Sequence, residues 1–275
     1  MIRFAANDVV AAREGNRAAL DAIVRSAERP VFNMAMRMLG NRADAEDATQ
    51  EILVKIITHL GSVRDVNSAG AWAFKIACRH LVNERRRGSI EEMQLSFNTF
   101  AEDLERDLSP ISDAGLNEVE QKVAIEEVKV GCTLAMLVCL SRELRIAYIL
   151  GEIFEVSATQ AADILGVSSA AFRQRLQRAR AAVTAFVTKS CGRVTDDAAC
   201  RCQLRVGHAL SISRISKGQR NLTTGLPDAL AVKRNIDLLE HGRSSAGLMR
   251  SNPDFVTHVG RLVMQMIETK DGIKS

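Results

Sequence analysis

The chain has 275 residues, of which 47% are apolar and 25% charged, and its formal net charge is only +4. This length allows one large domain or two to three small ones. Four prolines, one tryptophan and one tyrosine argue against a β-sandwich or barrel, and the remaining composition favours helices. No run approaches the roughly 18 apolar residues of a membrane span, and the start MIRFAANDVV lacks a signal-peptide pattern. We therefore expect an all-α cytoplasmic protein without a membrane partner.

An acidic helix is predicted early in the chain. Residues 1–39 form one or two helices, with Pro30 expected to start the second. The stretch DAEDATQEILVKI follows at residues 44–56. Its apolar side has helical spacing and comprises Ala45, Ala48, Ile52 and Ile56. Its other side is acidic and comprises Asp44, Asp47, Gln50 and Glu51. A carboxylate stripe on so short a helix indicates a basic partner surface.

A basic helix is predicted next, from about Ser68 to Arg87. Its polar face and flanks comprise Trp72, Lys75, Arg79, His80, Asn83 and Arg86. An aromatic ring among bases suits single-stranded DNA, because the ring stacks on an unpaired base while cations hold the backbone. The alternative for Trp72 is burial against a neighbouring helix. The following residues 91–120 contain nine acids and one arginine, and residues 91–115 are predicted to be an acidic linker.

A helix-turn-helix is predicted in residues 157–189. Ser157 caps a first helix, Gly166 supplies the turn, and Ser168 or Ser169 caps a second helix. One face of the second helix is apolar, with Phe172 and Leu176. The DNA-binding set predicted on the rest of it comprises Ser169, Arg173, Gln174, Arg175, Gln177, Arg178 and Arg180. Gln and Arg read base edges and flanking Arg holds phosphates. The alternative is a solvated basic face on a structural helix.

The last segment, residues 190–275, gathers cysteines. Three thiols and one imidazole lie within eighteen residues: Cys191, Cys200, Cys202 and His208. These ligand types suit tetrahedral zinc, although the spacing differs from that of a standard finger. A redox switch and a set of ordinary thiols are the alternatives, while the other three cysteines fit apolar helix faces. Two further helices, at 226–240 and 253–268, are predicted to pack on the helix-turn-helix domain and restrain it.

Three segments together resemble a known family. The segments are DAEDATQE, AWAFKIACRHLVNERRR and SRELRIAYILGEIFEVSATQAADILGVSSAAFRQRLQRAR. In order and spacing, over most of residues 8–189, they resemble bacterial RNA polymerase sigma factors of the extracytoplasmic-function group. The resemblance implies that the first docks on the β′ clamp helices of core polymerase. It implies that the second melts and reads the −10 promoter element and that the third reads the −35 element.

The same resemblance extends to other parts of the chain. The cysteine cluster is similar to a subgroup with a Cys-rich C-terminal extension, which implies a regulatory appendage. An anti-sigma factor is a further candidate partner. The acidic linker either mimics nucleic-acid charge inside the polymerase or is a solvated, disordered spacer.

These observations predict four parts and one function. The parts are a sigma-2-like domain (1–90), an acidic linker (91–115), a sigma-4-like helix-turn-helix domain (116–189) and a helical extension (190–275). The predicted function is promoter-specific transcription initiation with core RNA polymerase. The alternative is a helix-turn-helix regulator that binds DNA without joining the polymerase. An enzyme is not expected, because the zinc-hydrolase, deaminase, Walker and dinucleotide motifs are absent from the sequence. No cofactor is required, and zinc is a candidate only for the extension.

Overall fold

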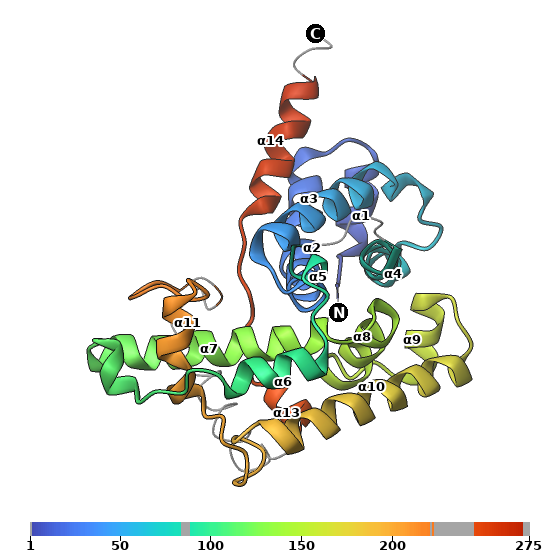
Figure 1. The fold of residues 1–275 in the computed structure, drawn as a ribbon. Coiled ribbons are helices and arrows are strands. Elements are labelled where there is room, and N and C mark those ends of the chain that lie inside the picture. The colour runs from blue at the N-terminus through green and yellow to red at the C-terminus, as the bar shows by residue number, and fades with distance from the viewer. Residues whose placement is uncertain (1, 84–88, 221, 223–244, 272–275) are drawn as a thin grey trace.

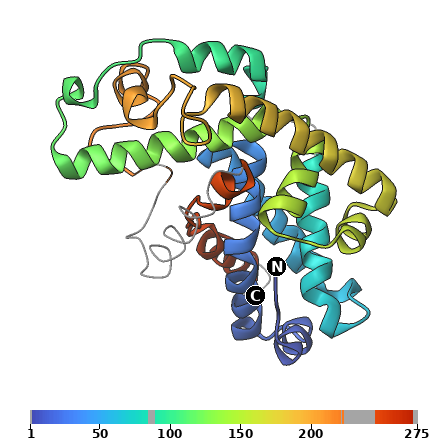
Figure 2. The same cartoon turned by 90° about the horizontal axis from the view of Figure 1, so that it is seen from below.

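The computed structural model describes residues 2–83, 89–220, 222 and 245–271, and every regular element in these ranges is helical. The predicted all-α fold is thus confirmed. Figures 1 and 2 show α1–α4 as one group of helices and α7–α10 as another, with the last helix, α14, running along the first group. Among these residues, no helix is long and apolar enough to cross a bilayer.

The first group is organised around the long helix α2. It contains α1 (Ala6–Arg13), α2 (Arg17–Leu39), α3 (Arg42–Thr58), the short turns η1 (Leu60–Ser62) and η2 (Val66–Ser68), and α4 (Ala69–Asn83). The prediction that Pro30 starts a helix is wrong, because α2 continues through it. Proline removes one helical hydrogen bond. The complete burial of Val31, Phe32 and Met34 just beyond it supplies tertiary packing that keeps the helix continuous.

The predicted acidic linker is in fact partly helical. It contains α5 (Ser89–Glu92), α6 (Phe97–Glu105) and η3 (Ile111–Ala114). A capping box between Ser96 and Thr99 starts α6. Phe100 is 2% exposed and its ring stacks on Phe186 of the helix-turn-helix group, with centroids 5.4 Å apart. The alternative of a solvated, disordered spacer is therefore wrong for α6, because this helix packs its apolar side on the core.

The second group contains the predicted helix-turn-helix. It comprises α7 (Glu118–Val138), α8 (Arg142–Tyr148), the π-helical turn η4 (Ile149–Ile153), α9 (Ala158–Leu165) and α10 (Ser169–Ser190). The predicted helix caps and the predicted glycine turn are confirmed. The hydroxyl of Ser157 accepts from the amide of Gln160 at 3.3 Å, and that of Ser168 accepts from the amide of Ala171 at 3.1 Å. Gly166 adopts φ +70°, which explains its place in the turn.

The extension returns to both groups. It comprises η5 (Cys202–Arg205), α11 (Val206–Ser211), α13 (Ser245–Arg250) and α14 (Val259–Asp271). The predicted helix at 226–240 lies outside the described residues. The helix predicted at 253–268 begins at residue 259, after a non-helical approach. One hydrophobic core joins residues from α1 to α14, and a smaller one lies between α7, α11 and η3.

Candidate functional site

The acidic helix α3 divides into the two sides that its spacing predicts. Ala45, Ile52 and Ile56 are fully buried. On the other side Asp47 and Glu51 are exposed, while two further members of the predicted set, Asp44 and Gln50, are half-buried. The side chain of Asn41 accepts from the amide of Asp44 at 3.1 Å and so caps the helix. The exposed carboxylates are available to a basic partner.

The basic helix α4 lies against the helix-turn-helix. Lys75 pairs with Asp163 of α9, with Nζ and Oδ1 3.1 Å apart. The guanidinium of Arg79 lies beside Gly166, where a Cβ atom would come within 2.9 Å of it. Trp72 is half-buried and packs on the core, as the burial alternative expects in part, and its stacking on an unpaired base stays a prediction. The predicted DNA-binding face of α4 therefore meets α9 and the turn that follows it (Figure 1).

The rest of the α4 set occupies different surroundings. Nδ1 of His80 lies 2.6 Å from Nζ of Lys55, and its Nε2 lies 3.6 Å from a carboxylate oxygen of Glu51. The ring of His80 on α4 therefore contacts two residues of the acidic helix α3. Asn83 is exposed at the end of the described part of α4, and Arg86 lies outside the described residues.

The second helix of the helix-turn-helix, α10, presents a polar face to solvent. Phe172 and Leu176 are 1% and 8% exposed. The four residues predicted to read bases are all exposed: Arg173, Gln174, Gln177 and Arg178. The two flanking arginines are paired with acids of the preceding helices, Arg175 with Glu143 at 3.4 Å and Arg180 with Glu152. Ser169, also predicted to bind DNA, is half-buried as the first residue of α10. The predicted base-reading set is thus exposed to solvent, and of the two flanking arginines Arg175 is half-buried and Arg180 is exposed but paired.

The cysteine cluster differs in membership from the predicted zinc set. His208 lies between two acids of the linker, with Nδ1 3.1 Å from Asp107 and Nε2 3.6 Å from Asp103. Burial raises the pKa of Cys132 well above its usual value, and the neighbouring thiols Cys202, Cys200 and Cys191 raise it further. Cys132 of α7, predicted to be a core residue, is thus the thiol beside the tail cysteines. Within the described ranges, no three His, Cys, Asp or Glu side chains are placed to hold a metal ion.

Burial also determines the chemistry of these thiols. It raises the pKa of Cys200 to about 11, with the neighbouring thiols adding to the shift and Arg205 opposing it. The pKa of Cys202 is raised by burial as well, while Arg193 lowers it. Since the thiolate is the reactive form, the raised pKa values of Cys200 and Cys202 keep both thiols protonated near neutral pH. The nearby arginines do not outweigh the burial of these two thiols, which counts against a redox role for them.

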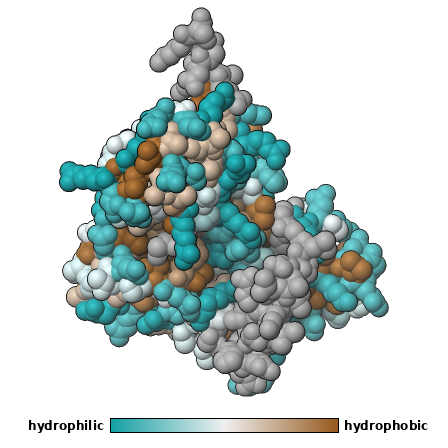
Figure 3. Space-filling view, turned by 180° about the vertical axis from the view of Figure 1, so that it is seen from behind, coloured by the Kyte–Doolittle hydropathy of each residue, from teal (hydrophilic) through white to brown (hydrophobic). Residues whose placement is uncertain are grey.

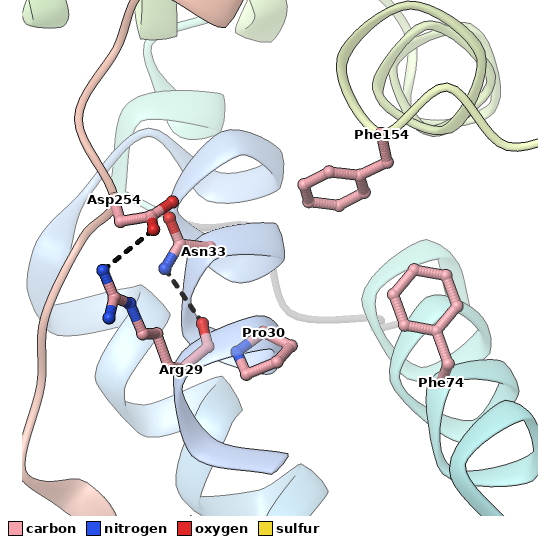
Figure 4. A pocket seen from close by; sticks show the side chains of 6 residues that line it. All are labelled: Arg29, Pro30, Asn33, Phe74, Phe154 and Asp254. Carbon is pink, nitrogen blue, oxygen red and sulfur yellow. Dashed lines mark hydrogen bonds and ion pairs between the residues drawn. The ribbon is translucent and has the colours of Figure 1, made fainter. Parts of the chain in front are cut away.

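A pocket of about 220 Å³ lies where the two groups and the C-terminal segment meet. Figure 4 shows the rings of Phe74 and Phe154 on one side and the ion pair of Arg29 with Asp254 on the other, 2.8 Å apart. Pro30 and Asn33 complete the lining. On the face seen in Figure 3, hydrophobic residues form separate patches in a largely hydrophilic surface.

Sequence reasoning missed Arg145, which joins the two groups. Its guanidinium is 2% exposed and donates to the carbonyls of Leu137, Val138 and Leu140 at 2.9–3.0 Å. It also donates to the carbonyl of Met38 at the end of α2. An arginine at the fourth position of α8 carries no sequence signal for this role. Only the fold brings the ends of α2 and α7 to it.

Comparisons with known proteins match both groups. The family model of Sigma-70 region 2 matches residues 23–89, and that of Sigma-70 region 4 matches residues 131–183. The ECF RNA polymerase sigma factor SigE of Mycolicibacterium smegmatis is 28% identical over 180 residues, which are 64% of this chain and 65% of that protein. The ECF RNA polymerase sigma factor SigJ of Mycobacterium tuberculosis is 29% identical over 157 residues, 56% of this chain and 47% of that protein. The chain thus spans less than two thirds of each relative, and residues 190–275 lie outside both family matches.

Proposed function

The chain belongs to the extracytoplasmic-function sigma factors, and from this premise we propose that it is a dissociable promoter-specificity subunit of RNA polymerase. It binds core polymerase, directs initiation at promoters with matching −10 and −35 elements, and carries out no catalysis itself. Its place of action is the cytoplasm, where the polymerase and the promoters are. The observation that carries the proposal is that one chain presents an exposed acidic stripe on α3, the basic helix α4 and the helix-turn-helix α9–α10.

Core polymerase binds to α3 in this proposal. Asp47 and Glu51 present carboxylates to solvent, and Asp44 and Gln50 flank them. Such a stripe complements a basic helical surface, which the family resemblance identifies as the β′ clamp helices. Opposite charges across an interface steer association and fix its register. An anti-sigma factor, if the chain has one, would have to cover the same stripe or the DNA-reading helices.

Promoter DNA binds to α10 and α4. The exposed side chains of Arg173, Gln174, Gln177 and Arg178 read the −35 element in the major groove. Arg175 and Arg180 add contacts to phosphates once they leave their intramolecular acids. Lys75, Arg79, Asn83 and Arg86 hold the melted −10 strand. The ring of Trp72 is half-buried, so it needs little movement to stack on a base.

In vitro transcription with purified core polymerase tests this function. We expect promoter-specific transcripts only when the chain is added. The alternative, a regulator that acts outside the polymerase, binds duplex DNA but starts no transcript with core enzyme alone. The separate acidic and basic helices of the first group favour the sigma-factor function, because a regulator of that kind requires neither.

A charge-reversal variant tests the docking surface. Asp47→Arg combined with Glu51→Arg replaces two attractions with two repulsions, so we expect at least a ten-fold weaker Kd for core polymerase, about 1.4 kcal/mol. The matched control is Glu14→Arg with Asp197→Arg, which makes the same charge change at exposed positions away from α3. Equal affinity of the two double variants, with helical content retained, would contradict the assignment of α3.

A further inference from the structure

The C-terminal strap, residues 252–271, passes from the helix-turn-helix group to the first group. Figure 1 shows it leaving α13, crossing the gap between the groups and continuing as α14 beside α2 and α3. At its start Asn252 and Thr133 of α7 exchange hydrogen bonds of 2.7 and 3.0 Å. Just before it, Arg250 donates to the carbonyl of Glu152 at 3.1 Å and pairs with Glu155. The strap is therefore anchored on the promoter-reading side before it reaches α2.

The strap binds to α2 through hydrogen bonds to the strap backbone and through a buried aromatic ring. The side-chain amide of Asn33 donates to the carbonyl of Phe255 at 2.8 Å and accepts from its amide at 2.9 Å. The ring of Phe255 is fully buried and lies 5.1 Å from the guanidinium of Arg37. Burial lowers the pKa of Arg37 to about 10. A buried aromatic ring with its backbone paired on both sides indicates a built binding site rather than a loose tail.

The first turn of α14 depends on a glycine. The amide of Gly260 donates to a carboxylate oxygen of Glu28 at 2.6 Å, and the neighbouring Val259 and Val263 are buried. A Cβ atom at position 260 would lie 2.9 Å from Val24 and 3.1 Å from Glu28. A larger side chain at position 260 therefore forces Val24, Glu28 or α14 itself to shift, which weakens the contact of α14 with α2.

The strap then covers one edge of the acidic helix. Arg42 donates to the carbonyl of Val256 at 2.8 Å, and Thr257 donates to Glu46 at 3.2 Å. One turn further along, Gln50 donates to the sulfur of Met266 at 3.2 Å. Because Arg42, Glu46 and Gln50 follow at intervals of four, they form one stripe of α3, directly beside Asp47 and Glu51. A partner helix that touches both Gln50 and Glu51 must take the place of Met266.

The described arrangement also cannot read a promoter as a whole. The −10 and −35 elements are about 25 base pairs apart, which is about 85 Å of B-form duplex. Yet α4 packs directly on α9, with Lys75 paired to Asp163. Because α4 touches the helix-turn-helix that carries α10, one chain cannot reach both elements until the groups separate. The strap is anchored on both groups, so its release favours this separation.

From these contacts we propose that the C-terminal strap and core RNA polymerase compete for the same face of α2 and α3, so that the strap inhibits the chain in cis. The inference rests on the proposed docking function of α3. The occupant of the face in the resting protein is the chain's own strap, and the polymerase displaces it. Displacement frees Gln50 for docking and frees α4 from α9 for DNA. Only molecules with the strap released bind polymerase. The apparent affinity is therefore the affinity of the released form multiplied by the fraction of molecules in that form.

A full-length Gly260→Leu variant tests the competition. The control is Arg261→Leu, which places the same side chain at the next, exposed position of α14. If the strap is seated in about nine-tenths of the molecules, Gly260→Leu should bind core polymerase about ten-fold more tightly, and Arg261→Leu should match the wild type. Hydrogen exchange of the amides of residues 259–263 should be faster in Gly260→Leu alone, which shows that the strap has left.

A peptide of residues 252–271, added in trans, gives the second measurement. We expect it to weaken polymerase binding by Gly260→Leu, and the same peptide carrying leucine at position 260 to have no effect. Released strap amides together with an unchanged Kd and no effect of the peptide would overturn the competition and leave docking intact. If neither the wild type nor Gly260→Leu binds core polymerase, the proposed function itself fails.

Discussion

Replacing Arg145 should lower the free energy of unfolding more than replacing another side chain of similar size. Arg145→Met keeps a long apolar side chain but removes the hydrogen bonds to the carbonyls of Leu137, Val138, Leu140 and Met38. A hydrogen bond to a charged group contributes about 1.5–3 kcal/mol. Their simple addition is too large, because desolvating the guanidinium costs several kcal/mol. Three of the four carbonyls lie at the end of α7 and the fourth at the end of α2, where helix dipoles favour a cation.

We expect a net loss of about 3–5 kcal/mol, because each buried carbonyl left without a donor costs about 1–3 kcal/mol while removal of the buried guanidinium recovers part of that loss. Arg145→Lys keeps the charge but has one nitrogen, so about half of the loss should remain. The exposed Arg173→Met is the control and should change stability by less than about 0.5 kcal/mol. Urea unfolding followed by circular dichroism gives the values from the shift in midpoint. A loss below about 1 kcal/mol for Arg145→Met would refute the view that this residue joins α2 to α7.

Three further predictions concern the promoter-reading face, the linker and the thiols. Gln174→Ala should cost about 1–3 kcal/mol at a single −35 base pair, measured on singly substituted promoters; an equal loss on every sequence would contradict base reading by the exposed face of α10. Asp103→Ala removes the acceptor shared by Arg205 and Arg214 at 3.1 and 3.2 Å, so limited trypsin digestion should cut residues 201–214 faster, whereas Asp113→Ala should leave the rate unchanged. Cys200 should react slowly with iodoacetamide at pH 7, because burial raises the pKa of its thiol to about 11. The alkylation rate should rise as the pH approaches 11. Fast alkylation at neutral pH would show that the thiolate is present and would favour the redox hypothesis. Zinc in the extension stays a prediction, and elemental analysis of Cys132→Ser against Cys139→Ser tests whether the α7 thiol belongs to such a site.

The sequence alone determined the features that depend on a few neighbouring residues. Helical spacing correctly placed Ala45, Ile52 and Ile56 inside and Asp47 and Glu51 outside, because burial follows the 3.6-residue period. The serine caps and the turn glycine of the helix-turn-helix were equally readable, since capping and positive φ are local demands of the backbone. These local signals were sufficient to predict the fold class, and the resemblance of three segments to known sigma factors predicted the family.

Only the tertiary structure decided how distant parts of the chain meet. The local rule for Pro30 failed because packing on both sides keeps α2 continuous, and the acidic linker gained a helix because Phe100 finds Phe186. His208 faces linker acids rather than cysteines. The strap lies mainly on α2 and α3 rather than on the helix-turn-helix domain, where it was predicted to pack. The contact of Asn33 with Phe255 joins residues 222 positions apart. The local sequence around either residue does not predict the other as its partner. Such pairings depend on shape and hydrogen bonding between folded surfaces, which exist only once the helices have packed.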